Sequence, residues 1–172
     1  MSSQAENVAA TMTTSRSCTI EIQNHNETYW LTNPKWHMIS GHIHYPPQPT
    51  IQSTKTGMCT FTKTEMGLRG AVGVLTYELS QVADEECEKL VAIMFSVPFD
   101  QNLYANEMAV GVFNNDRVCN EGLYKQMYED RECDDFKRTK AKDSGLNLKA
   151  DIVNVRATMS TGGKAVIKME IH

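Results

Sequence analysis

The sequence predicts an all-β fold, specifically a β-sandwich flanked by two short helices. Apolar and polar residues alternate with a period of two near both ends of the chain, which is typical of half-buried strands. Apolar runs of strand length lie between those ends, and turn residues separate them. This spacing favours a sandwich over alternating β–α units. A chain of 172 residues fits one domain and can bury a real core.

The first 16 residues form an arm ahead of the first alternating segment. Met1, Ala5, Val8 and Met12 fall on one face of a helix, although alanine buries little apolar surface. We expect residues 1–16 to be a mobile, weakly amphipathic N-terminal arm and residues 17–172 to be the sandwich.

Strands account for most of the remaining chain. The alternation begins at 19–23, and central strands are expected at 58–62, 71–79, 90–97 and 108–113. The second and third of these central strands are apolar on both faces, which indicates that both faces are covered.

The last two strands are expected to form a hairpin. Residues 153–159 and 165–171 both alternate, and Gly162 and Gly163 lie between them. Paired glycines supply the positive φ that a tight hairpin turn needs.

One internal helix is expected after the strand at 108–113. Asn120 can cap it, Leu123 and Met127 can pin it to the sheet, and Tyr124 and Tyr128 lie beside them. The charged stretch 130–143 that follows is expected to be solvated.

The charge and the chain ends limit the function classes. A net charge of −4 argues against nucleic-acid binding and against a polybasic contact with anionic lipid. The net charge leaves two classes of ligand, a net-neutral headgroup such as phosphocholine and a glycan. No apolar run is long enough to span a bilayer, and the N-terminus has no signal-peptide core. We expect a soluble protein, cytosolic or unconventionally secreted, that acts at a membrane surface.

Catalytic and metal-binding motifs are absent from the sequence, so we do not expect an enzyme or a cofactor. Five widely spaced cysteines without a C-x-x-C pair indicate free thiols. His37, His42 and His44 come nearest to a metal cluster, but no carboxylate or thiol lies close to them in the sequence. We therefore expect no metal site.

Aromatic residues offer two interpretations. A loop with Phe99, Leu103 and Tyr104 follows a strand that ends before Pro98. These residues, like Tyr124 and Tyr128, are commonly core residues. A tyrosine cluster can also bind a choline-type cation, because aromatic faces attract quaternary ammonium and phenols can donate to phosphate.

Two sequence blocks carry a family resemblance. Residues 70–77 read GAVGVLTY, and residues 95–106 read FSVPFDQNLYAN. In this order and at this separation, the blocks resemble the signature core of the actinoporins, the pore-forming cytolysins of sea anemones. Weaker similarity runs from about Ser17 to Ile171.

The resemblance implies a sandwich with two helices, no cofactor and a phosphocholine pocket that recognises sphingomyelin. It implies that Tyr104, Tyr124 and Tyr128 enclose the ammonium while Ser40 and Ser96 place the headgroup. The pocket positions carried over are Ser40, Val72, Ser96, Pro98, Tyr104, Tyr124 and Tyr128. The membrane-facing loop positions are Phe99, Leu103 and Met108.

In the family, the N-terminal helix inserts into the bilayer, and soluble monomers assemble there into a cation-conducting pore. A fully helical arm of 16 residues would reach about 24 Å, against a hydrocarbon core of about 30 Å. We therefore expect lipid binding with weakened pore formation. The alternative is a glycan-binding lectin resembling the fungal fruit-body lectins, because tyrosines also stack on sugars and Glu107 and Glu129 suit a sugar pocket.

Overall fold

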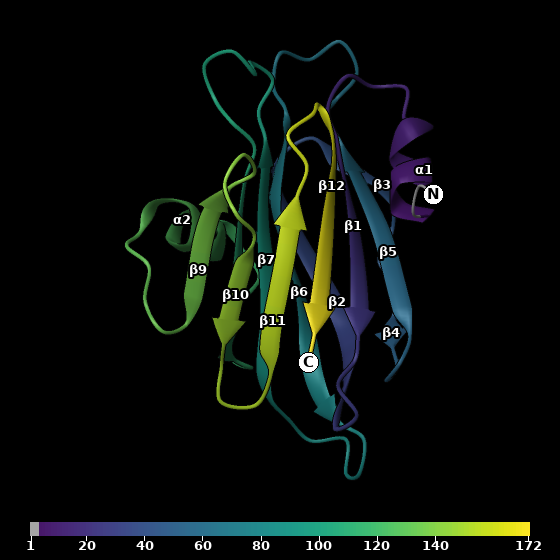
Figure 1. The fold of residues 1–172 in the computed structure, drawn as a ribbon, viewed down its shortest axis with the longest axis vertical. Coiled ribbons are helices and arrows are strands. Elements are labelled where there is room, and N and C mark those ends of the chain that lie inside the picture. Colours follow the sequence, from purple (N-terminus) through teal and green to yellow (C-terminus); the bar gives the residue numbers. More distant parts are fainter. Residues whose placement is uncertain (1–3) are drawn as a thin grey trace.

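Two six-stranded sheets pack face to face, as the sequence predicts (Figure 1). A computed structural model describes residues 4–172. The strands of sheet A, in spatial order, are β10 (Leu146–Lys149), β11 (Asn154–Met159), β12 (Lys164–Ile171), β1 (Ser17–Asn24), β5 (Thr56–Thr62) and β3 (His42–Tyr45). Those of sheet B are β4 (Thr50–Ile51), β2 (Tyr29–Ser40), β6 (Ala71–Gln81), β7 (Cys87–Val97), β8 (Glu107–Asn114) and β9 (Phe136–Lys140).

Strands β1 and β12 pair in parallel in the middle of sheet A. The ladder runs from Ser17 opposite Lys164 to Asn24 opposite Ile171. On its other side, β1 pairs antiparallel with β5. The first and last strands of the chain are thus joined along their whole length.

The main core lies between the sheets and is built from the inward-facing residues of each strand. Phe61 of β5 and Phe95 of β7 are fully buried, and their ring centroids are 4.7 Å apart across the two sheets. Cys18 and Cys59 are buried free thiols in the same core. A second cluster, with Val74 and Met94 on the outer face of sheet B, explains why β6 and β7 are apolar on both faces.

Helix α2 (Glu121–Glu129) covers that outer face of sheet B, and its cap is the predicted one. The Asn120 side chain accepts a hydrogen bond from the Leu123 backbone nitrogen at 3.0 Å. Leu123 and Met127 are fully buried. Arg138 of β9 donates to the Met127 carbonyl at 2.8 Å and so fastens the end of the helix to the sheet.

Helix α1 (Gln4–Ala10) lies against sheet A, on the other side of the molecule from α2 (Figure 1). Its buried residues, Ala5 and Ala9, pack on Val166 of β12. The predicted face included Val8, which is only half-buried, and Met1, which lies outside the described residues. Within residues 4–172, no helix has the length and hydropathy needed to cross a bilayer.

The hairpin of β11 and β12 is confirmed, but the proposed role of its glycines is wrong. Among residues 4–172, Gly41 is the only glycine with a positive φ, at 86°, where the chain passes from β2 in sheet B to β3 in sheet A. Gly163 is required for a different reason. A Cβ atom there would lie 2.6 Å from the Ser15 carbonyl oxygen.

The stretch 130–143 is not a simple solvated loop, because it contains β9. Phe136 is fully buried there and stacks on Phe113 with ring centroids 6.5 Å apart. A single apolar residue among charged ones gives no alternation that would predict a strand. In the structure, Phe136 packs against Phe113 and anchors β9 at the edge of sheet B.

We predict that Phe95→Ala lowers the free energy of unfolding by about 3–5 kcal/mol, because it leaves a cavity against Phe61 between the sheets. Chemical denaturation measures this. The control Val82→Ala, at a position 46% exposed, should change stability by less than about 0.5 kcal/mol. Similar losses for both variants would contradict the central position of Phe95.

Candidate functional site

A row of side chains crosses sheet B at the end where β7 stops and β8 begins. The register places Ser40 beside Val72, Val72 beside Ser96, and Ser96 beside Glu107. Residues directly opposite each other in antiparallel strands face the same side. Three predicted site residues therefore form one row, together with Glu107.

Two tyrosines of α2 lie over this row. The rings of Tyr124 and Tyr128 are stacked, with centroids 5.5 Å apart and planes 14° apart. The Ser96 side chain lies beside the Tyr124 phenol. Tyr104, from the loop after β7, lies close enough to Tyr128 to interact with it electrostatically. The structure thus stacks Tyr124 on Tyr128 and places Tyr104 in their neighbourhood.

The cluster is open to solvent on one side. Tyr104 is 61% exposed and Tyr128 is half-buried, whereas Tyr124 is 7% exposed. Tyr124 therefore forms the floor of the cluster, and the other two rings form its edge.

Burial and nearby carboxylates keep the phenols protonated. Burial raises the pKa of Tyr124, and the charges of Tyr128, Glu107 and Glu129 raise it further. The pKa of Tyr128 is raised by burial first and then by Glu107, although Arg138 acts in the opposite direction. At neutral pH both phenols are hydrogen-bond donors in a negatively charged environment.

The loop between β7 and β8 is held in one shape by its own polar side chains. Asp100 accepts hydrogen bonds from the backbone nitrogens of Asn102 and Leu103, at 3.0 and 3.1 Å. The buried Asn106 side chain donates to the carbonyls of Ser160 and Gly162, at 3.0 and 2.9 Å. Three side chains project outward from this frame: Phe99, Leu103 and Tyr104 are 36%, 74% and 61% exposed.

Met108 does not belong to this exposed loop, and its prediction as a membrane-facing residue is wrong. The side chain is fully buried in the core between the sheets. Strand β8 already begins at Glu107, so alternation turns Glu107 outward and Met108 inward, opposite Phe95.

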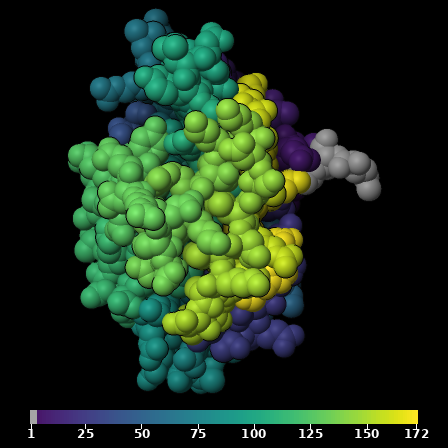
Figure 2. All heavy atoms as spheres, turned by 60° about the vertical axis from the view of Figure 1, so that its left-hand side comes forward, coloured from purple at the N-terminus to yellow at the C-terminus, as the bar shows by residue number. Residues whose placement is uncertain are grey.

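A second exposed loop, between β5 and β6, was missed by the sequence analysis. Met66 and Leu68 are 100% and 79% exposed there. Figures 1 and 2 show the loops 63–70 and 98–106 at the same end of the molecule. They touch at Gly70, where a Cβ atom would collide with the Val97 carbonyl. The signal available in the sequence was two apolar residues around a glycine between strands.

A hollow of about 570 Å³ lies under this second loop and includes the predicted residue Ser40. The Ser40 hydroxyl donates to the Gly70 carbonyl at 2.9 Å. The lining residues include Ile39, Ser40, Gly41, Thr64, Leu68 and Arg69.

Two cations hold Phe99 at the root of its loop. The Arg16 guanidinium lies 5.7 Å from the centroid of the Phe99 ring, and the Lys63 ammonium lies 5.6 Å from it. Arg16 also donates to the carbonyls of Pro98 and Phe99, at 3.0 and 2.7 Å. The predicted residue Pro98 is therefore placed by its carbonyl contact with the segment that links α1 to β1.

Residues 6–172 match the family model described as sea anemone cytotoxic protein. The chain belongs to this family, the actinoporins. It is 31% identical over 123 residues to DELTA-alicitoxin-Pse1b of Phyllodiscus semoni, which covers 71% of this chain and 49% of that protein. It is 32% identical over 79 residues to the deep-sea actinoporin Cjtox I of Cribrinopsis japonica, and this alignment covers 46% of this chain and 33% of that protein. This actinoporin-like chain thus spans about half the length of the alicitoxin.

A solved structure supports the fold. The lipid-binding protein Nakanori superimposes with a TM-score of 0.74 at 12% identity, covering 98% of this chain and 78% of that one. At this identity the similarity concerns the architecture alone.

We predict that alkaline pH destabilises the actinoporin-like fold partly through Tyr124. The folded-state pKa is raised, so this contribution is intact below the ordinary tyrosine pKa of about 10 and is lost as the pH rises above it. The unfolded chain then releases the proton more readily than the folded one. Denaturation at several pH values should show a shallower alkaline loss for Tyr124→Phe than for the wild type. Each protein's free energy of unfolding is compared with its own value at neutral pH. If the wild type and Tyr124→Phe lose the same amount as the pH rises, the raised pKa of Tyr124 is contradicted.

Proposed function

We propose that this protein binds membrane lipids that carry a phosphocholine headgroup, including sphingomyelin, and that it is a binding protein rather than an enzyme. The observation that carries the proposal is the group formed by Tyr104, Tyr124 and Tyr128. These rings lie near two loops that carry exposed apolar side chains, Met66 and Leu68 on one and Phe99 and Leu103 on the other.

The cluster suits the positive part of a phosphocholine. Tyrosine faces attract a quaternary ammonium ion, and the attraction grows when the ion loses water. Glu107 and Glu129 add negative charge close to the two helix tyrosines. An ammonium placed against the edge formed by Tyr104 and Tyr128 gains from both effects.

The same cluster offers donors for the phosphate. The Tyr124 and Tyr128 phenols stay protonated, and the Ser96 hydroxyl lies beside them. Phenols and hydroxyls donate to phosphate oxygens without requiring a basic patch. This agrees with a net charge of −4, which disfavours purely electrostatic docking on anionic lipid.

The two loops supply the contact with the bilayer surface. Met66, Leu68, Leu103 and Phe99 project at one end of the sandwich, where exposed apolar residues are favoured only against another apolar phase. Their burial in the interface would add affinity that does not depend on the headgroup. The lipid binding named for Nakanori and the family assignment support this reading.

We further propose that copies assemble on the membrane and that pore formation is weak. Helix α1 spans 7 residues, which reach about 10 Å against a hydrocarbon core of about 30 Å. Its contact with sheet A rests on Ala5 and Ala9 against Val166, and on an ion pair of 2.9 Å between Glu6 and Lys168. Such a small contact permits release of the arm, but the arm reaches only part of the way across.

Glycan binding is the second candidate, because Glu107 and Glu129 could accept hydrogen bonds from sugar hydroxyls beside the stacked tyrosines. It predicts binding to immobilised glycans with no preference among vesicles. A glycan array run beside the vesicle assay separates the two functions.

We predict that Tyr128→Ala and Tyr104→Ala each weaken binding to vesicles of phosphatidylcholine and sphingomyelin by roughly fivefold or more, because each removes one aromatic face from the ammonium. Co-flotation or surface plasmon resonance measures the affinity. Tyr45→Ala is the matched control, since Tyr45 is 55% exposed on β3 of the other sheet.

Vesicles of phosphatidylethanolamine keep the phosphate but lack the quaternary ammonium, and they should bind weakly. Leu103→Glu should weaken vesicle binding while leaving the binding of soluble phosphocholine intact, which distinguishes the loop from the tyrosine cluster. Equal affinity for both kinds of vesicle would rule out choline recognition.

We also predict that the wild type binds sphingomyelin vesicles without efficient release of a trapped dye, because α1 spans 7 residues whereas a bilayer-spanning helix needs about 20. A variant lacking residues 1–10, which removes α1 but keeps Arg16 at the root of the Phe99 loop, should bind to a similar extent. Efficient release by the wild type that the deletion abolishes would show that the arm forms pores and would overturn the weakened-pore proposal.

A further inference from the structure

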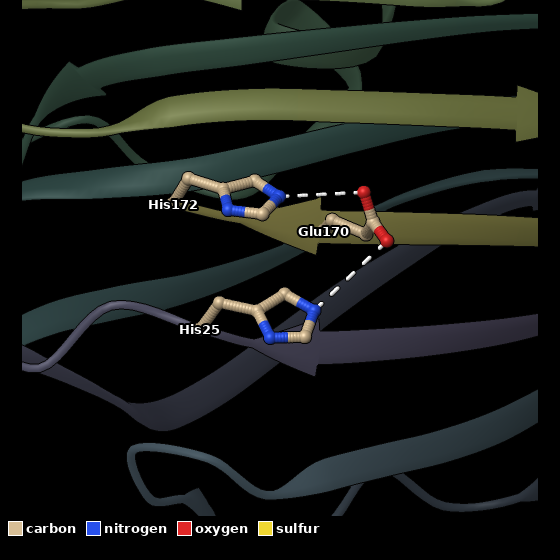
Figure 3. A group of neighbouring side chains, drawn as sticks. All are labelled: His25, Glu170 and His172. Atoms are coloured by element: carbon tan, nitrogen blue, oxygen red, sulfur yellow. Dashed lines mark hydrogen bonds and ion pairs between the residues drawn. The ribbon is translucent and has the colours of Figure 1, made fainter.

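A second group of functional side chains lies at the opposite end of the sandwich from the two exposed loops. His25, Glu170 and His172 come together at the ends of β1 and β12 (Figures 1 and 3). The parallel register places Gln23 opposite Glu170, and the next paired positions along the two strands lead to His25 and His172. Because His25 and His172 are 147 residues apart in sequence, only the β1–β12 pairing brings them together.

The two imidazoles converge on one carboxylate. The His172 Nε2 atom lies 3.3 Å from one Glu170 oxygen, and the His25 Nε2 atom lies 3.9 Å from the other. The rings stack with centroids 4.9 Å apart and planes 17° apart, so both Nε2 atoms face the carboxylate (Figure 3). The three candidate ligand atoms lie within 4.8 Å of one another.

We propose that His25, Glu170 and His172 form a binding site for a transition-metal dication, with Zn²⁺ as the best-suited ion. Zinc bonds of about 2.0–2.2 Å in a tetrahedral site separate the ligand atoms by roughly 3.4 Å. The three atoms, which lie within 4.8 Å of one another, would have to approach by up to about 1.4 Å to reach that spacing. Two imidazoles and one carboxylate favour zinc, copper or nickel over magnesium and calcium, which prefer all-oxygen ligands.

The fourth position is open to solvent or to the side chain of Gln23. The Gln23 Oε1 atom accepts a hydrogen bond of 3.1 Å from the His25 Nε2 atom, and a metal ion would replace the proton between them. Three protein ligands with one exchangeable position describe a site that holds a metal and still accepts a further ligand.

Surface ion pairs alone explain the arrangement less well. Such pairs contribute little in water, and the side chains of His25, Glu170 and His172 are 44%, 41% and 41% exposed. Two protonated imidazoles stacked face to face would also repel each other. A shared metal ion binds the neutral form of both rings, and both imidazoles and the carboxylate are then attracted to the same cation.

Neighbouring groups leave the carboxylate available. Arg156 of β11 is directly opposite Glu170 in the register. Among residues 4–172, the ion pairs of Glu170 are nevertheless with the two histidines. The backbone of His172 exchanges two hydrogen bonds of 2.8 Å with Asn154, whose buried Oδ1 atom has no partner. That oxygen is a candidate acceptor for the second ring nitrogen of His172, as ligating histidines commonly require.

The test is to titrate the tag-free protein with Zn²⁺. Binding is measured by calorimetry, and the change in stability is measured by thermal unfolding. Cys133→Ser serves as the background, since Cys133 is an exposed thiol that could bind zinc independently. We expect one Zn²⁺ per chain and a rise in Tm. His25→Ala and His172→Ala should each weaken zinc binding by about tenfold or more. Glu170→Gln should also bind zinc more weakly than the background protein does. Mg²⁺ should neither bind nor change the Tm.

The matched control is His42→Ala with His44→Ala, two exposed histidines on one face of β3. It should leave the affinity unchanged. Zinc affinity retained in the His25→Ala/His172→Ala double variant, or lost equally in the control, overturns the site. None of these readouts involves lipid, so the result is independent of the proposed function.

Discussion

The first and last strands of the chain pair in parallel in the middle of sheet A, and the other functional features are arranged around that ladder. At one end, Ser17 leads back to Arg16 and to the root of the exposed loop at Pro98 and Phe99. Along its length, the outer face of β12 presents Val166, on which α1 rests. At the far end, the same ladder brings His25 beside His172. A slip of the register would affect all three features together.

The tyrosine cluster illustrates how buried and exposed faces share one sheet. Sheet B is covered on its inner face by sheet A and on much of its outer face by α2, so β6 and β7 carry apolar residues on both sides. The cover of α2 ends at the row containing Ser96 and Glu107. There the polar side chains meet Tyr124 and Tyr128 instead of a closed core. A binding site at this position would need no further helix or strand, because it would form where the cover of sheet B by α2 stops.

Much of this architecture could be predicted from sequence, because alternation is a local signal. The strands at 58–62, 71–79, 90–97 and 108–113 are confirmed within a few residues, as are the Asn120 cap and the final hairpin. The alternation already placed Met108 in a strand, whereas its assignment to the membrane-facing loop followed from the resemblance alone; the structure buries it. Strand β9 was missed because Phe136 alone stands among charged residues.

The parts of the sites that depend on distant contacts could not be predicted by periodicity. The motif resemblance named Tyr104, Tyr124 and Tyr128; the structure stacks Tyr124 on Tyr128 and places Tyr104 near them. Met66 and Leu68 became relevant only when the loop between β5 and β6 was found beside the loop after β7. His37, His42 and His44 come nearest to a metal cluster in the sequence because they are neighbours in the chain. Neighbours in space, His25 and His172, are instead set by the parallel ladder.

Arg16 connects the arm to the exposed loop that follows β7. It lies between α1 and β1, and it donates to the carbonyls of Pro98 and Phe99 while its guanidinium faces the Phe99 ring. A displacement of Phe99 would remove the aromatic face and alter the carbonyl contacts at once. The apolar part of the α1 interface with sheet A includes Ala5, Ala9, Val166 and Met58, and small alanine side chains contribute little buried apolar area to it. The loop that would touch a bilayer is therefore coupled to the segment that holds the arm, through one side chain.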